Sequence, residues 1–158
     1  MTPNREILAR LPHRPPFLFV DEIVGRGDNA IHTAVTLSPD WPVFSGHYPG
    51  HPIVPGVILC EAIFQSGALL IGELTAQTPD GEPGGQSSAL PVVSRIFAAK
   101  FKRQVMPGDR LEIEVKLNER MGAAWLMKGT IRVKGKMAAQ VEFSCALTSY
   151  SDSSLMLG

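Results

Sequence analysis

Two residues of this chain, a histidine and a glutamate, could together perform acid–base chemistry. Glu61 lies in an apolar stretch, residues 57–71, whose other clearly polar residues are Gln65 and Ser66. A buried carboxylate is costly unless it is paired or hydrogen-bonded, and a buried carboxylic acid can keep its proton near neutral pH and act as a general acid. The nearest histidine in the sequence is His47, a residue type suited to serve as the base. Glu61 is thus a candidate acid. Alternatively, it is a structural carboxylate whose hydrogen bonds are satisfied in the core or at a subunit interface.

The start of the same stretch adds a third chemical element. Pro55 and Gly56 are typical of a helix start, where the backbone amides of Gly56 and Val57 would have no partner within the helix. A carbonyl oxygen bound there would be polarised. Gln65 follows Glu61 by one helical turn, so it could orient the carboxylate or only satisfy it. This set suits removal of a proton next to a carbonyl, followed by loss of a leaving group.

Other interpretations of these residues are weaker. His47 and His51 have the spacing of a metal pair on a helix, but Pro49 and Gly50 stand between them and no third ligand follows. No metal is therefore expected. Cys60 has apolar neighbours, which disfavours a nucleophilic thiolate. His13 and His32 are expected to be structural.

The elements that must position these residues follow from periodicity and turn chemistry. A buried helix is expected from Pro55 to Leu74, because residues 57–74 are almost wholly apolar. Residues 39–55, rich in Pro and Gly, predict an ordered loop. The sequence thus predicts one α+β domain over residues 1–158, an antiparallel sheet wrapped around one long helix. The other predicted elements are a short helix at 4–10, strands at 17–24, 30–37, 90–101, 111–117, 123–134 and 139–147, a flexible surface loop at 75–88 and a disordered tail at 150–158.

Composition excludes several classes of protein. The 158 residues are 44% hydrophobic and 19% charged, with 15 basic and 15 acidic residues, which argues against disorder and against a nucleic-acid binder. The N-terminus does not resemble a signal peptide, no apolar run is expected to span a membrane, and two distant cysteines do not make a disulfide scaffold. A cytoplasmic protein is expected. The charge is uneven, because residues 95–136 hold 11 basic and 4 acidic residues, which favours an acidic partner.

Four motifs in this order resemble one family. They are LPHRPPF at residues 11–17, GHYPGHPIVPGV at 46–57, EAIFQ at 61–65 and KFKRQVMPGD at 100–109. Together they resemble the bacterial 3-hydroxyacyl-acyl-carrier-protein dehydratases of fatty acid synthesis, the FabZ type, over about residues 5–149.

The resemblance implies a hot-dog fold, homodimers commonly assembled as trimers of dimers, and an active site at the dimer interface. It implies that His47 is the base, that Glu61 of the other subunit is the acid, and that the Gly56 amide polarises the thioester carbonyl. The substrate would arrive on the phosphopantetheine of acyl carrier protein, with no further cofactor. The family's later motif makes Lys100, Lys102 and Arg103 the candidate carrier-protein patch.

Some residues differ from the family pattern. Tyr48 stands where Phe is more usual, and the segment 92–99 differs, with Val92 near an aromatic gate position and Phe97 where Asp is frequent. Glu61, where the related isomerising enzymes typically have Asp, favours plain dehydration. A thioesterase or CoA-linked hydratase of the same fold, and a non-catalytic acyl-binding subunit of a specialised lipid pathway, remain the alternatives.

Overall fold

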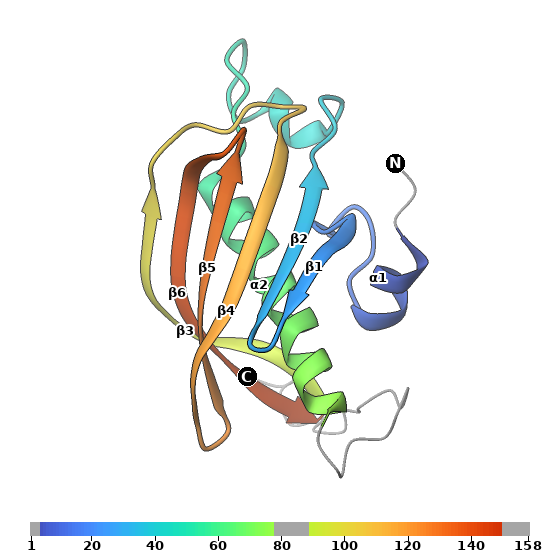
Figure 1. Cartoon of the computed structure of the whole chain (residues 1–158). Helices are drawn as coiled ribbons and strands as arrows, with labels where there is room; N and C mark the ends of the chain where they lie inside the picture. The colour runs from blue at the N-terminus through green and yellow to red at the C-terminus, as the bar shows by residue number, and fades with distance from the viewer. Residues whose placement is uncertain (1–3, 78–88, 150–158) are drawn as a thin grey trace, which may run out of the picture.

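A six-stranded antiparallel sheet wraps around one long helix (Figure 1). The computed structural model describes residues 4–77 and 89–149. In this part of the chain the helices are α1 (Arg5–Arg10) and α2 (Gly56–Ala76), and the strand order is β1-β2-β4-β5-β6-β3. The strands are β1 (Glu22–Gly27), β2 (Ala30–Thr36), β3 (Ala89–Phe101), β4 (Arg110–Met121), β5 (Ala124–Val133) and β6 (Lys136–Ser149). This is the hot-dog arrangement expected from the sequence.

The predicted strand at 17–24 is wrong in its first half, since β1 begins only at Glu22. The backbone of residues 17–19 is bound by a side chain of the helix rather than by a neighbouring strand. Gln65 accepts a hydrogen bond from the Phe19 amide at 2.8 Å and donates one to the Phe17 carbonyl at 3.2 Å. The polar groups that a strand would pair are thereby used to fasten this segment to α2.

The buried helix ends two residues later than predicted, at Ala76 rather than Leu74, and begins at Gly56. Thr75 and Ala76, expected to begin the loop at 75–88, therefore belong to α2. The rest of that predicted loop from residue 78 onwards, and the predicted tail at 150–158, lie outside the described residues.

By length and composition alone α2 could cross a membrane, contrary to the expectation that no run would be long enough. Its place inside the sheet accounts for that composition, because Ile63, Leu69, Leu70 and Ile71 are all at most 1% exposed. The helix is the centre of the hydrophobic core.

One glycine lets the sheet approach this helix. A Cβ atom at Gly129 of β5 would stand 2.1 Å from Cγ2 of Ile63 on α2. Only a residue without a side chain fits there, so Gly129 sets how closely β5 packs on the helix.

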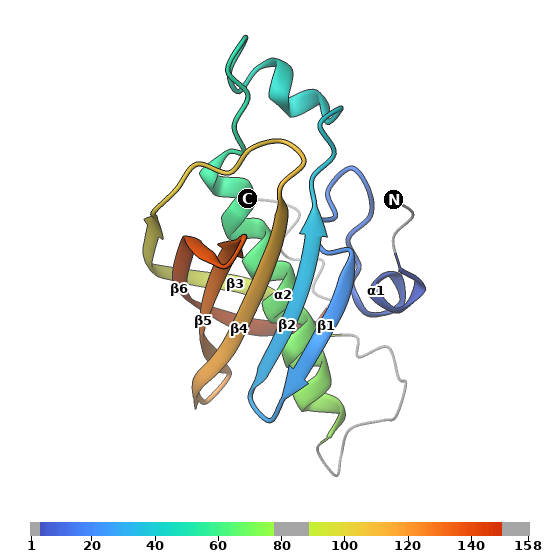
Figure 2. The same cartoon turned by 45° about the horizontal axis from the view of Figure 1, so that its top comes forward.

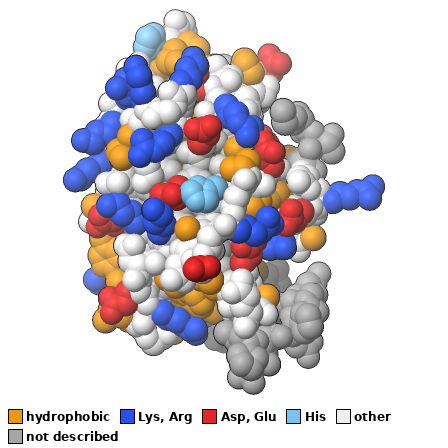
Figure 3. All heavy atoms as spheres, in the orientation of Figure 1, with side chains coloured by type: hydrophobic (Ala, Val, Ile, Leu, Met, Phe, Trp, Pro, Cys, Tyr) orange, Lys and Arg blue, Asp and Glu red, His pale blue; other side chains and the backbone are white. Residues whose placement is uncertain are grey.

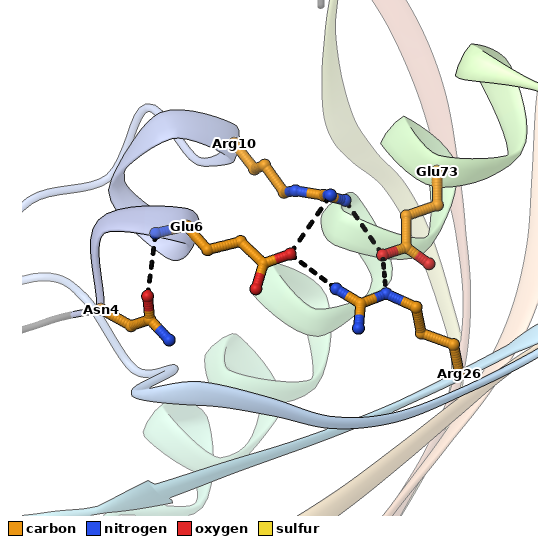
Figure 4. A network of polar contacts seen from close by, with 5 residues as sticks. All are labelled: Asn4, Glu6, Arg10, Arg26 and Glu73. Carbon is orange, nitrogen blue, oxygen red and sulfur yellow. Dashed lines mark hydrogen bonds and ion pairs between the residues drawn. The ribbon is translucent and has the colours of Figure 1, made fainter.

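The short helix α1 is fastened to α2 and β1 by charged side chains (Figure 4). Glu73 of α2 accepts hydrogen bonds from Arg10 at 3.0 Å and from Arg26 of β1 at 2.7 Å. Arg26 and Arg10 also contact Glu6, at 2.6 and 3.2 Å. Asn4 caps the helix by accepting from the Glu6 amide. This network fixes the start of the segment that runs from α1 to β1.

The segment between β2 and α2 projects beyond the end of the sheet, as the turned view in Figure 2 shows. It is an ordered loop, as predicted, and contains one turn of 3₁₀ helix at Pro42–Ser45. A hydrogen bond of 2.8 Å from the Val54 amide to the Val105 carbonyl ties it to the chain between β3 and β4. His47 and the start of α2 therefore lie at the same end of the molecule.

Candidate active site

His47 is held in a short, internally bonded loop. Its backbone amide donates to Val43 O at 3.0 Å, and its carbonyl accepts from the Ile53 amide at 3.1 Å. Its ring Nδ1 lies 3.0 Å from the Ile53 carbonyl. Because a carbonyl oxygen can only accept, Nδ1 carries the proton in this bond. In the neutral ring Nε2 is then the unprotonated nitrogen, which is the state required of a base.

Tyr48 stacks on His47, with ring centroids 4.2 Å apart and planes 25° from parallel. The tyrosine is 53% exposed, so it covers one side of the imidazole without closing it off. This contact restricts the orientation of the His47 ring.

Gln65 contacts Glu61 on α2, as expected for two residues one helical turn apart. The Gln65 amide nitrogen donates to Glu61 Oε1 at 3.0 Å, and Gln65 is only 1% exposed. Because its amide oxygen already accepts from Phe19, the nitrogen must face Glu61 and the Phe17 carbonyl. Gln65 therefore fixes one oxygen of the carboxylate.

The carboxylate of Glu61 lies at a pocket of about 350 Å³. Most of the wall is apolar or weakly polar, and Val92 and Val93 of β3 contribute to it. The lining residues are His13, Glu61, Phe64, Gln65, Ala68, Pro91, Val92, Val93 and Cys145. His47 is not among them, so the candidate base does not line this pocket within one chain.

The histidine that does lie beside Glu61 is His13, for which the sequence predicts only a structural role. Its Nε2 is 3.6 Å from Glu61 Oε1. Burial lowers the pKa of His13 below its ordinary value of 6.5, an effect that the Glu61 carboxylate opposes and Arg14 reinforces. The only signal for this contact in the sequence is the place of His13 in the first family motif, because no helical or strand periodicity relates two residues 48 positions apart.

The amides of Gly56 and Val57 begin α2, and Pro55 before them gives no side-chain cap. The aromatic ring of Phe101 lies over this helix start, since a Cβ atom at Gly56 would be 3.1 Å from two of its ring carbons. Phe101 is 52% exposed. The predicted carbonyl-binding position is therefore an uncapped helix start beside an exposed aromatic ring at the end of β3.

Neither cysteine has the environment of a nucleophile. Burial raises the pKa of the Cys145 thiol to about 12 and also raises the pKa of Cys60. Within residues 4–77 and 89–149, no three His, Cys, Asp or Glu side chains gather where they could hold a metal ion.

Lys100, Lys102 and Arg103 flank Phe101 and are all exposed. In the described part of the chain none of them forms an ion pair, whereas Lys116, Lys128 and Lys134 lie within 4 Å of a carboxylate. Lys and Arg side chains are spread widely over the face seen in Figure 3, with acidic ones between them. The patch at residues 100–103 combines three cations without an ion pair among the described residues with a position next to the start of α2.

This chain is similar to known proteins in both its sequence and its fold. Residues 11–142 match the model of the FabA-like domain. The 3-hydroxyacyl-[acyl-carrier-protein] dehydratase FabZ of Anaeromyxobacter sp. strain K is 40% identical over 138 residues, covering 87% of this chain and 85% of the relative. FabZ of Dechloromonas aromatica strain RCB is 36% identical over 142 residues, covering 89% and 94%.

Solved structures with lower sequence identity have a similar fold. The dehydratase heterocomplex ApeI:P of Xenorhabdus doucetiae matches with a TM-score of 0.74 at 18% identity, over 96% of this chain and 97% of the other. A hypothetical thioesterase with coenzyme A from Streptococcus pneumoniae TIGR4 matches with a TM-score of 0.61 at 14% identity, over 81% and 85%. At these identities the structures share the fold alone. The sequence matches go further, and on their length and identity this chain belongs to the FabZ-type dehydratases of the FabA-like family.

Proposed function

We propose that the protein dehydrates 3-hydroxyacyl thioesters of acyl carrier protein to trans-2-enoyl thioesters in fatty acid synthesis. The observation that carries this proposal is the Glu61 carboxylate, held by Gln65 at the wall of a largely apolar pocket. Such a site can accept an acyl chain while presenting one acid to it. The family relationship supplies the reaction class.

The reaction needs a base, an acid and a stabilised carbonyl. His47 Nε2 takes the proton from C2, electrons move to form the C2–C3 double bond, and the C3–O bond breaks. Glu61 gives its proton to the departing hydroxyl, which leaves as water. The amides of Gly56 and Val57 stabilise negative charge on the thioester oxygen. No redox change occurs, and no cofactor beyond the carrier's phosphopantetheine is required.

The base and the acid come from two copies of the chain in this proposal. β3 lies at the edge of the sheet, and its apolar side chains Val92, Ile96 and Phe97 are 45–50% exposed. An exposed apolar edge strand is a liability unless another strand covers it. Because β3 also lines the Glu61 pocket, a second copy paired along β3 could bring its His47 towards Glu61. The expected assembly is a homodimer, extended to a trimer of dimers as the family resemblance implies.

Acyl carrier protein is the proposed partner, docking on Lys100, Lys102 and Arg103. These unpaired cations next to the start of α2 suit an acidic protein that delivers its arm to the Gly56 amide. A cytoplasmic location belongs to the same proposal, since α2 is the core helix of the fold.

Product analysis tests the proposed reaction. The protein is incubated with 3-hydroxyacyl carrier protein and with 3-hydroxyacyl-CoA of several chain lengths, and enoyl formation and free thiol release are followed separately. We expect a trans-2-enoyl product without release of thiol, and no shifted double bond. Thiol release without enoyl product would instead identify a thioesterase, and neither product would identify a non-catalytic acyl-binding subunit.

A further inference from the structure

We propose that His13 is a positioning residue for Glu61, acting as a second neutral hydrogen-bond donor beside Gln65. This inference rests on the proposed function, in which Glu61 is the acid. It is carried by the distance of 3.6 Å between His13 Nε2 and Glu61 Oε1 and by the place of both side chains in one pocket. The distance is longer than a hydrogen bond, but catalytic hydrogen bonds without substrate are often long and shorten in the complex.

The environment of the other ring nitrogen selects the tautomer that donates to Glu61. His13 Nδ1 is buried and has no hydrogen-bond partner in the described part of the chain. A proton on Nδ1 would leave a buried donor unpaired and would turn a lone pair of Nε2 towards the carboxylate. A proton on Nε2 avoids both costs. The neutral ring therefore presents its N–H to Glu61.

The segment that bears His13 is braced on both sides. Arg14 donates to the Leu11 carbonyl at 2.7 Å and to the Leu8 carbonyl at 3.0 Å, which closes the turn after α1. The His13 ring stacks on Phe17 at 6.4 Å between centroids, and the Phe17 carbonyl is bound by Gln65. Because Gln65 and Glu61 lie one turn apart on α2, one rigid helix sets the position of both partners.

The charge of His13 matters because Glu61, the proposed acid, must be able to give up its proton. Two charged groups act on the pKa of His13, Glu61 of α2 and the adjacent Arg14, and the thiol of Cys145 of β6 lines the same pocket. Burial and Arg14 keep the ring uncharged near neutral pH, while Glu61 opposes them. A full positive charge at this position would stabilise the Glu61 carboxylate and hinder proton donation. A neutral donor orients the carboxyl group with a smaller penalty of this kind.

Kinetics of two shape-matched variants test the role. His13→Phe keeps the stacking on Phe17 but removes the donor, and His13→Gln restores a neutral N–H. With a 3-hydroxyacyl pantetheine thioester we expect His13→Phe to lower kcat about tenfold, equal to about 1.4 kcal/mol, with little change in KM. His13→Gln should recover most of the loss, and His13→Lys should move the alkaline limb of the pH–rate profile to lower pH. A folded His13→Phe protein with wild-type kcat would overturn the inference.

A second measurement does not depend on turnover. Imidazole NMR follows the titration of His13 in the wild-type chain and in Glu61→Gln. Because the Glu61 carboxylate raises the pKa of His13, its removal should shift the His13 titration to lower pH, whereas Glu73→Gln should not. An unchanged titration in Glu61→Gln would refute the pairing. A wild-type protein that forms no enoyl product would refute the proposed function, and this NMR comparison would still decide whether His13 and Glu61 interact.

Discussion

Gln65 does two tasks with one buried amide. Its oxygen binds the backbone of Phe19, and its nitrogen binds both Phe17 and Glu61. The first task forces the second, since the amide cannot turn over without leaving the Phe19 N–H unpaired in the core. The orientation of Glu61 is therefore a consequence of how the segment after α1 is fastened to the helix.

Removing the base or the acid should lower turnover by orders of magnitude. We expect His47→Ala and Glu61→Gln each to reduce kcat by ~10²–10⁴, the usual contribution of one general acid or base. Glu61→Gln keeps the shape and the contact with Gln65 but cannot give up a proton. Steady-state assays of enoyl formation measure the effect. His32→Ala and Glu73→Gln serve as controls, because they change a histidine and a helix carboxylate outside the pocket. Wild-type turnover in His47→Ala would show that His47 is not the base.

The lowered pKa of His13 predicts how stability depends on pH. In the window between the folded-state pKa and 6.5, the unfolded chain binds a proton on His13 and the folded chain does not. The free energy of unfolding should therefore fall as pH decreases through this window. His13→Phe removes the group, so its stability should depend less on pH there. Urea titrations at a fixed protein concentration test this, and equal pH slopes for both proteins would contradict it.

At the scale of elements, the hydrophobic pattern was sufficient for the fold but not for all boundaries. The apolar run at 57–74 and the alternation within β4 and β6 predicted the helix and the sheet, because burial dictates both periods. The predicted strand begins at residue 17, whereas β1 begins at Glu22. The reason is that Gln65, 46 positions after Phe19, binds backbone groups that a neighbouring strand would otherwise bind.

The contacts of the candidate site could also be predicted only in part from the sequence. The Glu61–Gln65 contact was predictable because it lies within one turn of one helix. The contact of His13 with Glu61 depends on tertiary packing of a loop against that helix, which no local spacing encodes. The exposure of Val92, Ile96 and Phe97 depends on the position of β3 at the edge of the sheet, which the sequence of the strand does not encode.

The close approach of β5 to α2 predicts that Gly129→Ala is strongly destabilising. The new methyl group would lie 2.1 Å from Ile63 Cγ2, and overpacking of this kind typically costs about 1–3 kcal/mol. Chemical denaturation measures the loss. Gly72→Ala on α2, where nothing lies within 4 Å of the new methyl group, is the matched control and should be neutral or slightly stabilising. Ile63→Ala is itself destabilising, but the loss in the double variant Gly129→Ala/Ile63→Ala should be smaller than the sum of the two single losses. Strict additivity of the two changes would refute this steric explanation.

At the scale of the whole molecule, the zero net charge hides a division between an acidic amino-terminal part and a basic sheet. Most of the basic side chains on β4 and β5 have local partners, such as Lys128 with Glu142 at 3.7 Å. Pairing of this kind leaves the charges at residues 100–103 available to a partner.

Charge reversal tests the carrier-protein patch. We expect Lys100→Glu, Lys102→Glu and Arg103→Glu together to raise KM for carrier-bound substrate roughly tenfold, and the effect should shrink as salt increases. Lys128→Glu is the control on a locally paired lysine. Kinetics with a short pantetheine thioester should be unchanged in all variants, and an equal effect on that substrate would show that the patch does not bind the carrier.

The division of the active site between two chains is tested by mixing two inactive variants. His47→Ala and Glu61→Ala are unfolded and refolded together so that subunits exchange at random. In a mixed dimer one site then has both changes and the other has neither, if the base and the acid come from different chains. Since half of the dimers are mixed and half of their sites are intact, about a quarter of wild-type activity should return. If both residues acted from the same chain, every site would carry one change and the mixture would stay inactive. Refolding each variant alone controls for residual activity, and Ile96→Lys on β3, which should prevent pairing of the edge strands, should abolish the recovery.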